Sequence, residues 1–173
     1  MIFKNKNIPD NLKLFIGELD ETFLFKGGLQ FFSDEEILKH WTSKIAFHKH
    51  YKNVLSGDIP FACDYFGDLF FLRDDTVYKL YAEDGEIEPF DLTIENWFNL
   101  VLKDPEDFLN ISFDYSVQKG SLLMAYPPFC FEESSNSKIS EVPFEELILF
   151  HIELYKKVRE LKNGEKLEFI VKD

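Results

Sequence analysis

Residues 64–90 read DYFGDLFFLRDDTVYKLYAEDGEIEPF and contain the clearest strand and turn signals of the chain. Leu69–Leu72 is an uninterrupted apolar run, which is typical of a strand buried on both faces. Arg73-Asp74-Asp75 then turns the chain before a second strand, Val77–Tyr81. The sequence therefore predicts consecutive antiparallel strands at the centre of the chain.

A third strand completes the predicted meander. Asp84-Gly85 is a two-residue hairpin signal. It leads into Glu86–Phe90, which alternates polar and apolar residues as a half-buried strand does. Pro89 cannot donate a ladder hydrogen bond, so it indicates an edge strand.

Helix signals flank the meander on both sides. Ser33 before Asp34-Glu35-Glu36 is a capping-box signature, and it predicts a helix with one apolar side formed by Ile37, Leu38, Trp41 and Ile45. Thr93 is a second N-cap, and Pro105 is expected to end or interrupt its helix. The other expected elements are a short helix from Pro9, a strand over 29–32, an extended stretch over 126–131, an exposed loop over 132–140, a helix from about Pro143 to Asn163-Gly164, and a closing strand over 167–171.

Strands grouped in the middle with helices before and after them indicate an α+β fold with a mostly antiparallel central sheet, not βαβ winding. No internal repeat and no linker divides the chain. We therefore expect a single domain over residues 1–173.

The net charge of −13 is concentrated in one segment. Residues 58–107 hold 14 acidic and 3 basic side chains, whereas residues 1–57 hold 7 acidic and 8 basic ones. Because phosphate binding requires clustered Lys and Arg, nucleic acid is not an expected partner. The interleaved apolar residues predict a folded element with an acidic face.

The composition also predicts the setting of the protein. No apolar run approaches the roughly 20 residues that span a bilayer, so no membrane association is expected. The N-terminus lacks the apolar stretch of a signal peptide, and two cysteines are too few for a disulfide framework. The expectation is a soluble cytoplasmic protein, and its oligomeric state stays open.

Four stretches of the chain form a combined pattern: Gly27-Gly28-Leu29; Ile59 to Leu72; the Asp84 to Glu88 hairpin with 94–98 and 104–109; and Leu122 to Cys130 with the closing helix through His151 and Arg159. Together these stretches resemble the SMI1/KNR4 family of the SUKH superfamily. Phe66-Gly67-Asp68 is also similar to the GAD-like and DUF1851-type immunity proteins, which leaves the subfamily open.

This resemblance implies a compact α+β fold that binds proteins, without an enzymatic site or a cofactor. Many bacterial members are inferred to be immunity proteins that bind and neutralise a toxin of a competition system. Fungal members act in cell-wall regulation through protein contacts. Fold alone does not settle the partner.

Several residues could carry chemistry, and each also has a structural explanation. Asp64 and Asp68 flank a turn glycine, where turn stabilisation or interface acidity is favoured over acid–base or cation chemistry, because no further oxygen ligands have calcium-loop spacing. His40, His48 and His50 lie among lysines without paired metal-ligand spacing, so a solvated basic patch is expected.

The remaining candidates are more readily explained by packing. His151 lies on the apolar side of the last helix, where a core histidine is expected. Cys63 and Cys130 have apolar neighbours and are expected to be inert thiols. Tyr65, Tyr78 and Tyr81 are candidate interface anchors.

The leading hypothesis is a non-enzymatic, cytoplasmic immunity protein that binds a basic toxin domain. No catalytic, cofactor-binding or metal-binding residue is assigned. Two alternatives stay open: a regulatory or scaffold protein with a housekeeping partner, and an unrecognised hydrolase that uses Asp64, Asp68 or His151. The candidate partner-binding residues are Asp64, Asp68, Asp74, Asp75, Glu83, Asp84, Glu86 and Glu88.

Overall fold

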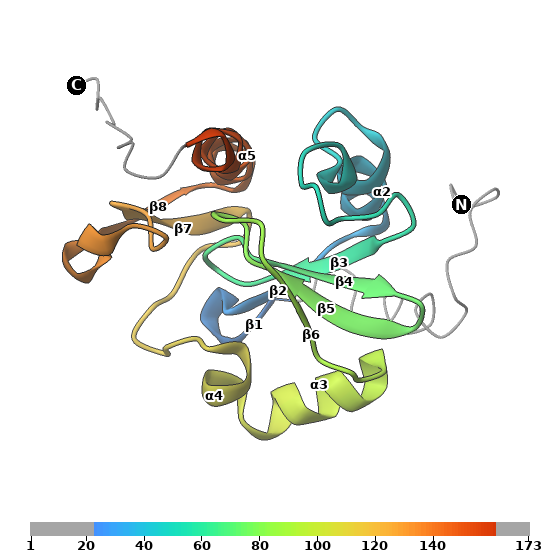
Figure 1. Cartoon of the computed structure of the whole chain (residues 1–173). Coiled ribbons are helices and arrows are strands. Elements are labelled where there is room, and N and C mark those ends of the chain that lie inside the picture. The colour runs from blue at the N-terminus through green and yellow to red at the C-terminus, as the bar shows by residue number, and fades with distance from the viewer. Residues whose placement is uncertain (1–22, 162–173) are drawn as a thin grey trace.

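A six-stranded antiparallel sheet with strand order β1-β2-β3-β4-β5-β6 forms the centre of the computed structural model, which describes residues 23–161 (Figure 1). The predicted helix from Pro9 and the predicted strand over 167–171 lie outside the described residues. The strands are β1 Phe23–Leu24, β2 Leu29–Phe31, β3 Ile59–Cys63, β4 Leu69–Arg73, β5 Thr76–Leu80 and β6 Ile87–Pro89.

A separate two-stranded sheet consists of β7 Ser121–Tyr126 and β8 Lys138–Pro143. The helices are α2 Asp34–Thr42, α3 Ile94–Lys103, α4 Pro105–Leu109 and α5 Phe144–Glu160, with short 3-10 turns η1 Phe25–Gly27, η2 Phe47–Lys49 and η3 Glu132–Asn136. This arrangement confirms the predicted α+β class with an antiparallel central sheet.

The apolar run of β4 is buried because helices cover both faces of the sheet. In Figure 1, α2 lies on one side of the sheet and α3 and α4 lie on the other. Phe70 packs against Trp97 of α3, with 5.0 Å between ring centroids. The adjacent Phe71 stacks on Tyr78 at 5.4 Å. Successive side chains of β4 point to opposite faces of the sheet, and both are buried, as the continuous apolar run predicts.

The first predicted turn of the meander is confirmed, and the second differs. Asp74 and Asp75 alone join β4 to β5, and both have positive φ angles of 49° and 64°, as a type I′ hairpin requires. The β5–β6 connection is longer than the two residues predicted, because the last paired residues are Leu80 and Ile87. Pro89 is confirmed on an edge strand.

The helix caps are confirmed. The Ser33 and Glu36 side chains form the reciprocal capping box of α2, and Thr93 accepts from the N–H of Asn96 at the start of α3. Pro105 begins α4 after α3 has ended. However, α2 ends at Thr42, so the predicted apolar side does not continue in the helix to Ile45.

Two predictions near the second sheet are wrong. The stretch after Tyr126 does not stay extended: Tyr126-Pro127 is a cis peptide, and the chain turns so that Phe131 N donates to Pro128 O. The predicted loop over 132–140 contains η3 and the first residues of β8, which pairs with β7 from Lys138 onward. β7 is a nearly continuous apolar run and β8 has only the separated Ile139 and Val142 among polar residues, so neither strand alternates regularly.

The predicted solvated histidine patch is wrong for His40. Its side chain is 2% exposed and packs against the rings of Phe32, Phe47 and Phe144, at centroid distances of 4.9, 5.0 and 5.4 Å. This aromatic cluster joins α2 to η2 and α5. Burial, and to a lesser extent Lys39, lowers the pKa of His40 to about 3.

His151 is a core residue, as predicted. It is 3% exposed on α5, and its Nδ1 has no hydrogen-bond partner among the described residues. Burial lowers the pKa of His151 to about 4, although Asp64 acts in the opposite direction. Both histidines are therefore neutral in the folded protein at neutral pH.

These two imidazoles predict loss of stability in mild acid. In the unfolded chain a histidine takes up a proton near pH 6.5, so their contribution is complete above that pH and is lost as pH falls toward 4 and 3. At pH 5 each buried histidine is expected to lower the free energy of unfolding by about 2 kcal/mol relative to pH 7.5.

The measurement is denaturant unfolding of the wild type, His40→Phe and His50→Gln at both pH values. His40→Phe is expected to lose about 2 kcal/mol less than the wild type on acidification. His50 is only half-buried, so His50→Gln serves as the control for replacing a histidine outside the core. An unchanged acid loss in His40→Phe would contradict the assignment.

Candidate functional site

The eight acids predicted to bind a partner lie at two opposite ends of the sheet. Asp74 and Asp75 form the β4–β5 turn. The loops that carry Asp64, Asp68, Glu83, Asp84 and Glu86 lie at the other end of the same strands, and Glu88 lies in β6. Since β5 has five residues, the two ends are roughly 16 Å apart. The sequence segment is continuous, but its acids do not form one cluster.

Lys79 of β5 connects two of these acids in the interior. Its Nζ lies 3.0 Å from Asp64 Oδ2 and 3.1 Å from Asp68 Oδ2. It also lies over the rings of Phe70 and Tyr81, 5.6 and 4.8 Å from their centroids. Burial alone would lower the pKa of Lys79, but the two carboxylates outweigh burial and raise it. Lys79 is therefore charged, and its ammonium group is shared by Asp64 and Asp68.

Asp64 organises the β3–β4 loop as well as binding Lys79. Its Oδ1 accepts from the N–H groups of Phe66 and Asp68 at 2.9 and 3.1 Å. Burial raises the pKa of Asp64 to about 6, against the opposing effect of Lys79. With 3% exposure, Asp64 offers almost no surface to a partner, so we remove it from the candidate contact residues.

The β5–β6 connection, Tyr81–Glu86, is called the acidic loop below. It is closed by hydrogen bonds from Tyr81 N to Glu86 O at 2.9 Å and from Gly85 N to Tyr81 O at 2.8 Å. Ala82 fixes it from both sides, because its N–H donates to Asp68 Oδ1 and its carbonyl accepts from Tyr51 Oη. The loop is therefore held by the β3–β4 loop and by the segment after η2.

The acidic loop also packs against α5 through Gly85. Gly85 has a φ of 75°, and a Cβ added there would lie 2.3 Å from the ring of Tyr155. That ring lies 4.7 Å from Tyr51, and Tyr155 Oη accepts from Lys52 N. Two tyrosines thus fix the loop, and no local signal in the sequence identifies them.

A cavity of about 410 Å³ opens beside the acidic loop. On its far side lies the turn Pro127–Phe131, where Cys130 N donates to Glu83 Oε2 at 2.8 Å. Burial raises the pKa of Glu83 above its ordinary value. The lining residues are Asp64, Phe66, Asp68, Lys79, Tyr81, Glu83, Asp84, Asn110, Phe129 and Cys130.

The three tyrosines predicted as anchors have different environments. Tyr65 is buried, and its hydroxyl donates to Ser112 O, so it is not a surface anchor. Tyr78 is half-buried under the guanidinium of Arg73, 5.0 Å from the ring centroid. Tyr81 lines the cavity and donates to Glu88 Oε2 at 2.6 Å. A fourth aromatic residue, Phe129, is 46% exposed, and no sequence pattern indicated it.

The groups that the hydrolase alternative requires do not all line this cavity. Asp64 and Asp68 line it, but His151 is not among the described residues around it. Burial, with a smaller effect of Glu83, raises the pKa of Cys130 to about 12, which keeps this thiol protonated. Cys63 is buried in the core, and burial raises its pKa as well. Over residues 23–161, no group of three or more acidic, histidine or cysteine side chains has metal-binding geometry.

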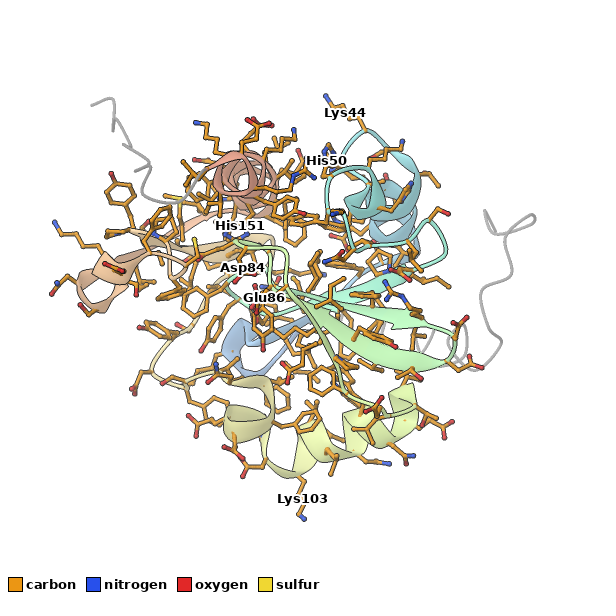
Figure 2. All side chains as sticks on the ribbon, in the orientation of Figure 1. Lys44, His50, Asp84, Glu86, Lys103 and His151 are labelled. Carbon is orange, nitrogen blue, oxygen red and sulfur yellow. The ribbon has the colours of Figure 1, made fainter. Side chains whose placement is uncertain are left out.

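The ion pairs explain where the surface charge lies. Arg73 binds Asp58 through Nε at 2.9 Å and through Nη2 at 2.6 Å, and Lys79 binds Asp64 and Asp68. Two of the three basic residues in 58–107 therefore form ion pairs with three acids of the same segment. The segment has eleven further acids and one further basic residue, Lys103. Figure 2 shows Lys103 projecting away from Asp84 and Glu86.

Comparison of the chain with protein-family models, with curated proteins and with solved structures finds no match in any of the three. Within the described residues, none of the helices combines the length and apolarity that crossing a membrane requires.

Removing Lys79 is expected to destabilise the fold strongly. Lys79→Met leaves two carboxylates beside each other without a cation, which costs about 3–5 kcal/mol of unfolding free energy at pH 7.5. The difference from the wild type should shrink at pH 5, because Asp64, whose pKa is already raised, takes up a proton and its charge is lost. Chemical denaturation at the two pH values measures this.

Lys103→Met is the matched control, because Lys103 is exposed and forms no ion pair with a described residue. Its effect is expected to be below about 0.5 kcal/mol at both pH values. A Lys79→Met protein as stable as the control, or one whose defect grows in acid, would contradict the ion-pair assignment.

Three glycines test how the acidic loop is fixed. Gly85→Ala combines a positive φ with the Tyr155 contact and is expected to cost about 3 kcal/mol. Gly120 has a φ of 84° with nothing within 4 Å of an added Cβ, so Gly120→Ala should cost about 1 kcal/mol. Gly57→Ala has neither constraint and should be neutral. Equal thermal stability of Gly85→Ala and Gly120→Ala would show that the Tyr155 contact does not fix the acidic loop.

Proposed function

We propose that the chain is a protein-binding domain that presents fixed carboxylates to a basic protein, in the role of a cytoplasmic immunity protein that neutralises a toxin domain. The observation that supports it is the charge distribution. The basic residues of strands β4 and β5, Arg73 and Lys79, are bound internally by Asp58, Asp64 and Asp68, so most other acids of the segment are exposed without an ion-pair partner among the described residues.

The rigidity of the acidic loop supports binding as well. Its backbone is fixed by Tyr51, Asp68 and the Gly85–Tyr155 contact, and Asp84 Oδ1 accepts from Glu86 N at 2.8 Å. A loop that is already ordered loses little conformational entropy when a partner binds. Complementary charge raises the association rate and suppresses wrong partners.

The immunity role rests on the resemblance to SMI1/KNR4 proteins together with this surface. A toxin that degrades nucleic acid needs a basic site of its own, which an acidic inhibitor complements. A toxin gene adjacent to the gene of this chain is therefore expected. Its absence would favour the regulatory alternative over immunity.

The test is calorimetric titration of the full chain with that toxin domain at about 50 and 500 mM salt. Asp84→Asn/Glu86→Gln is expected to weaken binding by about ten-fold at low salt and much less at high salt. Because both residues are exposed and bear no ion pair to a described residue, the fold should be retained.

Glu146→Gln/Glu160→Gln removes the same charge from exposed positions of α5 and is the matched control. Unchanged affinity in the control and reduced affinity in the loop variant support the proposal. If the loop variant binds as tightly as the wild type with the same salt dependence, the acidic loop is not the binding surface and the proposal fails.

A further inference from the structure

The cavity beside the acidic loop has the size of a binding pocket. Its volume of about 410 Å³ lies within the range of about 300–1,000 Å³ common for ligand sites. Segments far apart in sequence form it: the β3–β4 loop, β5, the acidic loop, the end of α4 and the Pro127–Phe131 turn. Several of these segments are hydrogen-bonded to one another, so the cavity is part of the folded structure.

An exposed aromatic ring forms part of its lining. Phe129 is 46% exposed, although its ring is fixed edge-to-face against Phe66 at a centroid distance of 4.9 Å. Phe66 packs in turn against Tyr65 and Tyr115, at 4.8 and 5.8 Å. An immobilised aromatic side chain that stays exposed beside a hollow is characteristic of interface anchors. Aromatic faces also attract cations.

The charge of the lining selects the kind of ligand. Four carboxylates and one ammonium group line the cavity, and the ammonium of Lys79 is already shared by Asp64 and Asp68. Glu83 and Asp84 have no ion-pair partner among the described residues, and backbone N–H groups of Cys130 and Glu86 fix their carboxylates. A cleft lined mainly by one sign of charge concentrates the opposite sign.

The core behind the β3–β4 loop adds no opposing charge. His151 packs against this loop, since a Cβ at Gly67 would lie 3.4 Å from His151 Cε1. Its buried imidazole is neutral at neutral pH, and its Nδ1 lacks a hydrogen-bond partner among the described residues. Among the residues that line the cavity, Lys79 is therefore the one positive charge.

We infer that the cavity receives one basic side chain, arginine or lysine, of the protein partner. Its aliphatic part packs against Phe66 and Phe129, and its cationic head lies at Glu83 and Asp84. Arginine suits the site better, because its planar guanidinium both stacks on aromatic rings and binds carboxylates. This inference rests on the proposed function, and it adds that the partner inserts this side chain into the cavity.

The experiment uses a blocked Gly-Arg-Gly tripeptide as the probe and the same peptide with citrulline, a neutral isostere, as its control. Amide chemical shifts of the full chain are followed by NMR up to about 50 mM peptide. The arginine peptide should shift the amides of Phe66, Glu83 and Cys130 with saturation. The citrulline peptide should leave them in place.

Asp84→Asn and Phe129→Ala should each weaken binding of the arginine peptide by about three-fold or more. Asp74→Asn is the matched control: it removes the same charge from an exposed turn at the opposite end of β5 and should leave the affinity unchanged.

Two results would overturn the inference. Equal weakening by Asp84→Asn and Asp74→Asn would show attraction by overall charge, without a pocket. Absence of saturating shifts at the cavity would show that it does not hold a basic side chain. In both cases the binding of the toxin domain to the loop variant decides the proposed function separately.

Discussion

The ion pairs of Lys79 with Asp64 and Asp68 are the interaction on which the functional end of the molecule depends. Lys79 is the penultimate residue of β5, where its buried side chain lies near two aromatic rings. A charge in that position is tolerated only because two carboxylates neutralise it. Those carboxylates belong to one loop, and their remaining oxygens accept from the backbone of that loop and of the acidic loop. One buried cation therefore fixes two loops.

The same arrangement separates buried from exposed charge. Asp58, Asp64 and Asp68 bind the cations of strands β4 and β5 and serve the fold. Asp74, Asp75, Asp84 and Glu86 occupy turns at the two ends of these strands and stay exposed. The turns thus carry the exposed charge at the two ends of these strands, and Glu95, Glu106 and Asp107 add exposed acids on α3 and α4. A charge total cannot distinguish these two classes of acid.

Much of the meander could be predicted because its signals are local. The apolar run of β4, the Asp74-Asp75 turn, Pro89 at an edge and the caps at Ser33 and Thr93 each depend on neighbours a few residues away. The length of the acidic loop could not, because Tyr51 and Tyr155 fix it from distant parts of the chain. His40 was misassigned for a related reason: adjacent lysines indicated solvent, whereas the rings of Phe32, Phe47 and the distant Phe144 pack around it in the folded protein.

The candidate site shows this limit most clearly. Sequence patterns identified its acids, since charge can be counted along the chain. They did not identify the cavity, whose far wall is a turn more than forty residues away that meets the acidic loop through the Glu83–Cys130 hydrogen bond. Nor did they indicate that Phe129 stays exposed while Tyr65 is buried. Exposure of an aromatic residue depends on which segments cover it, and those segments come together only in the folded protein.

Acidic residues alone are common on soluble surfaces. Their combination with an exposed ring in one hollow distinguishes this end of the sheet from the Asp74-Asp75 turn, which is also acidic.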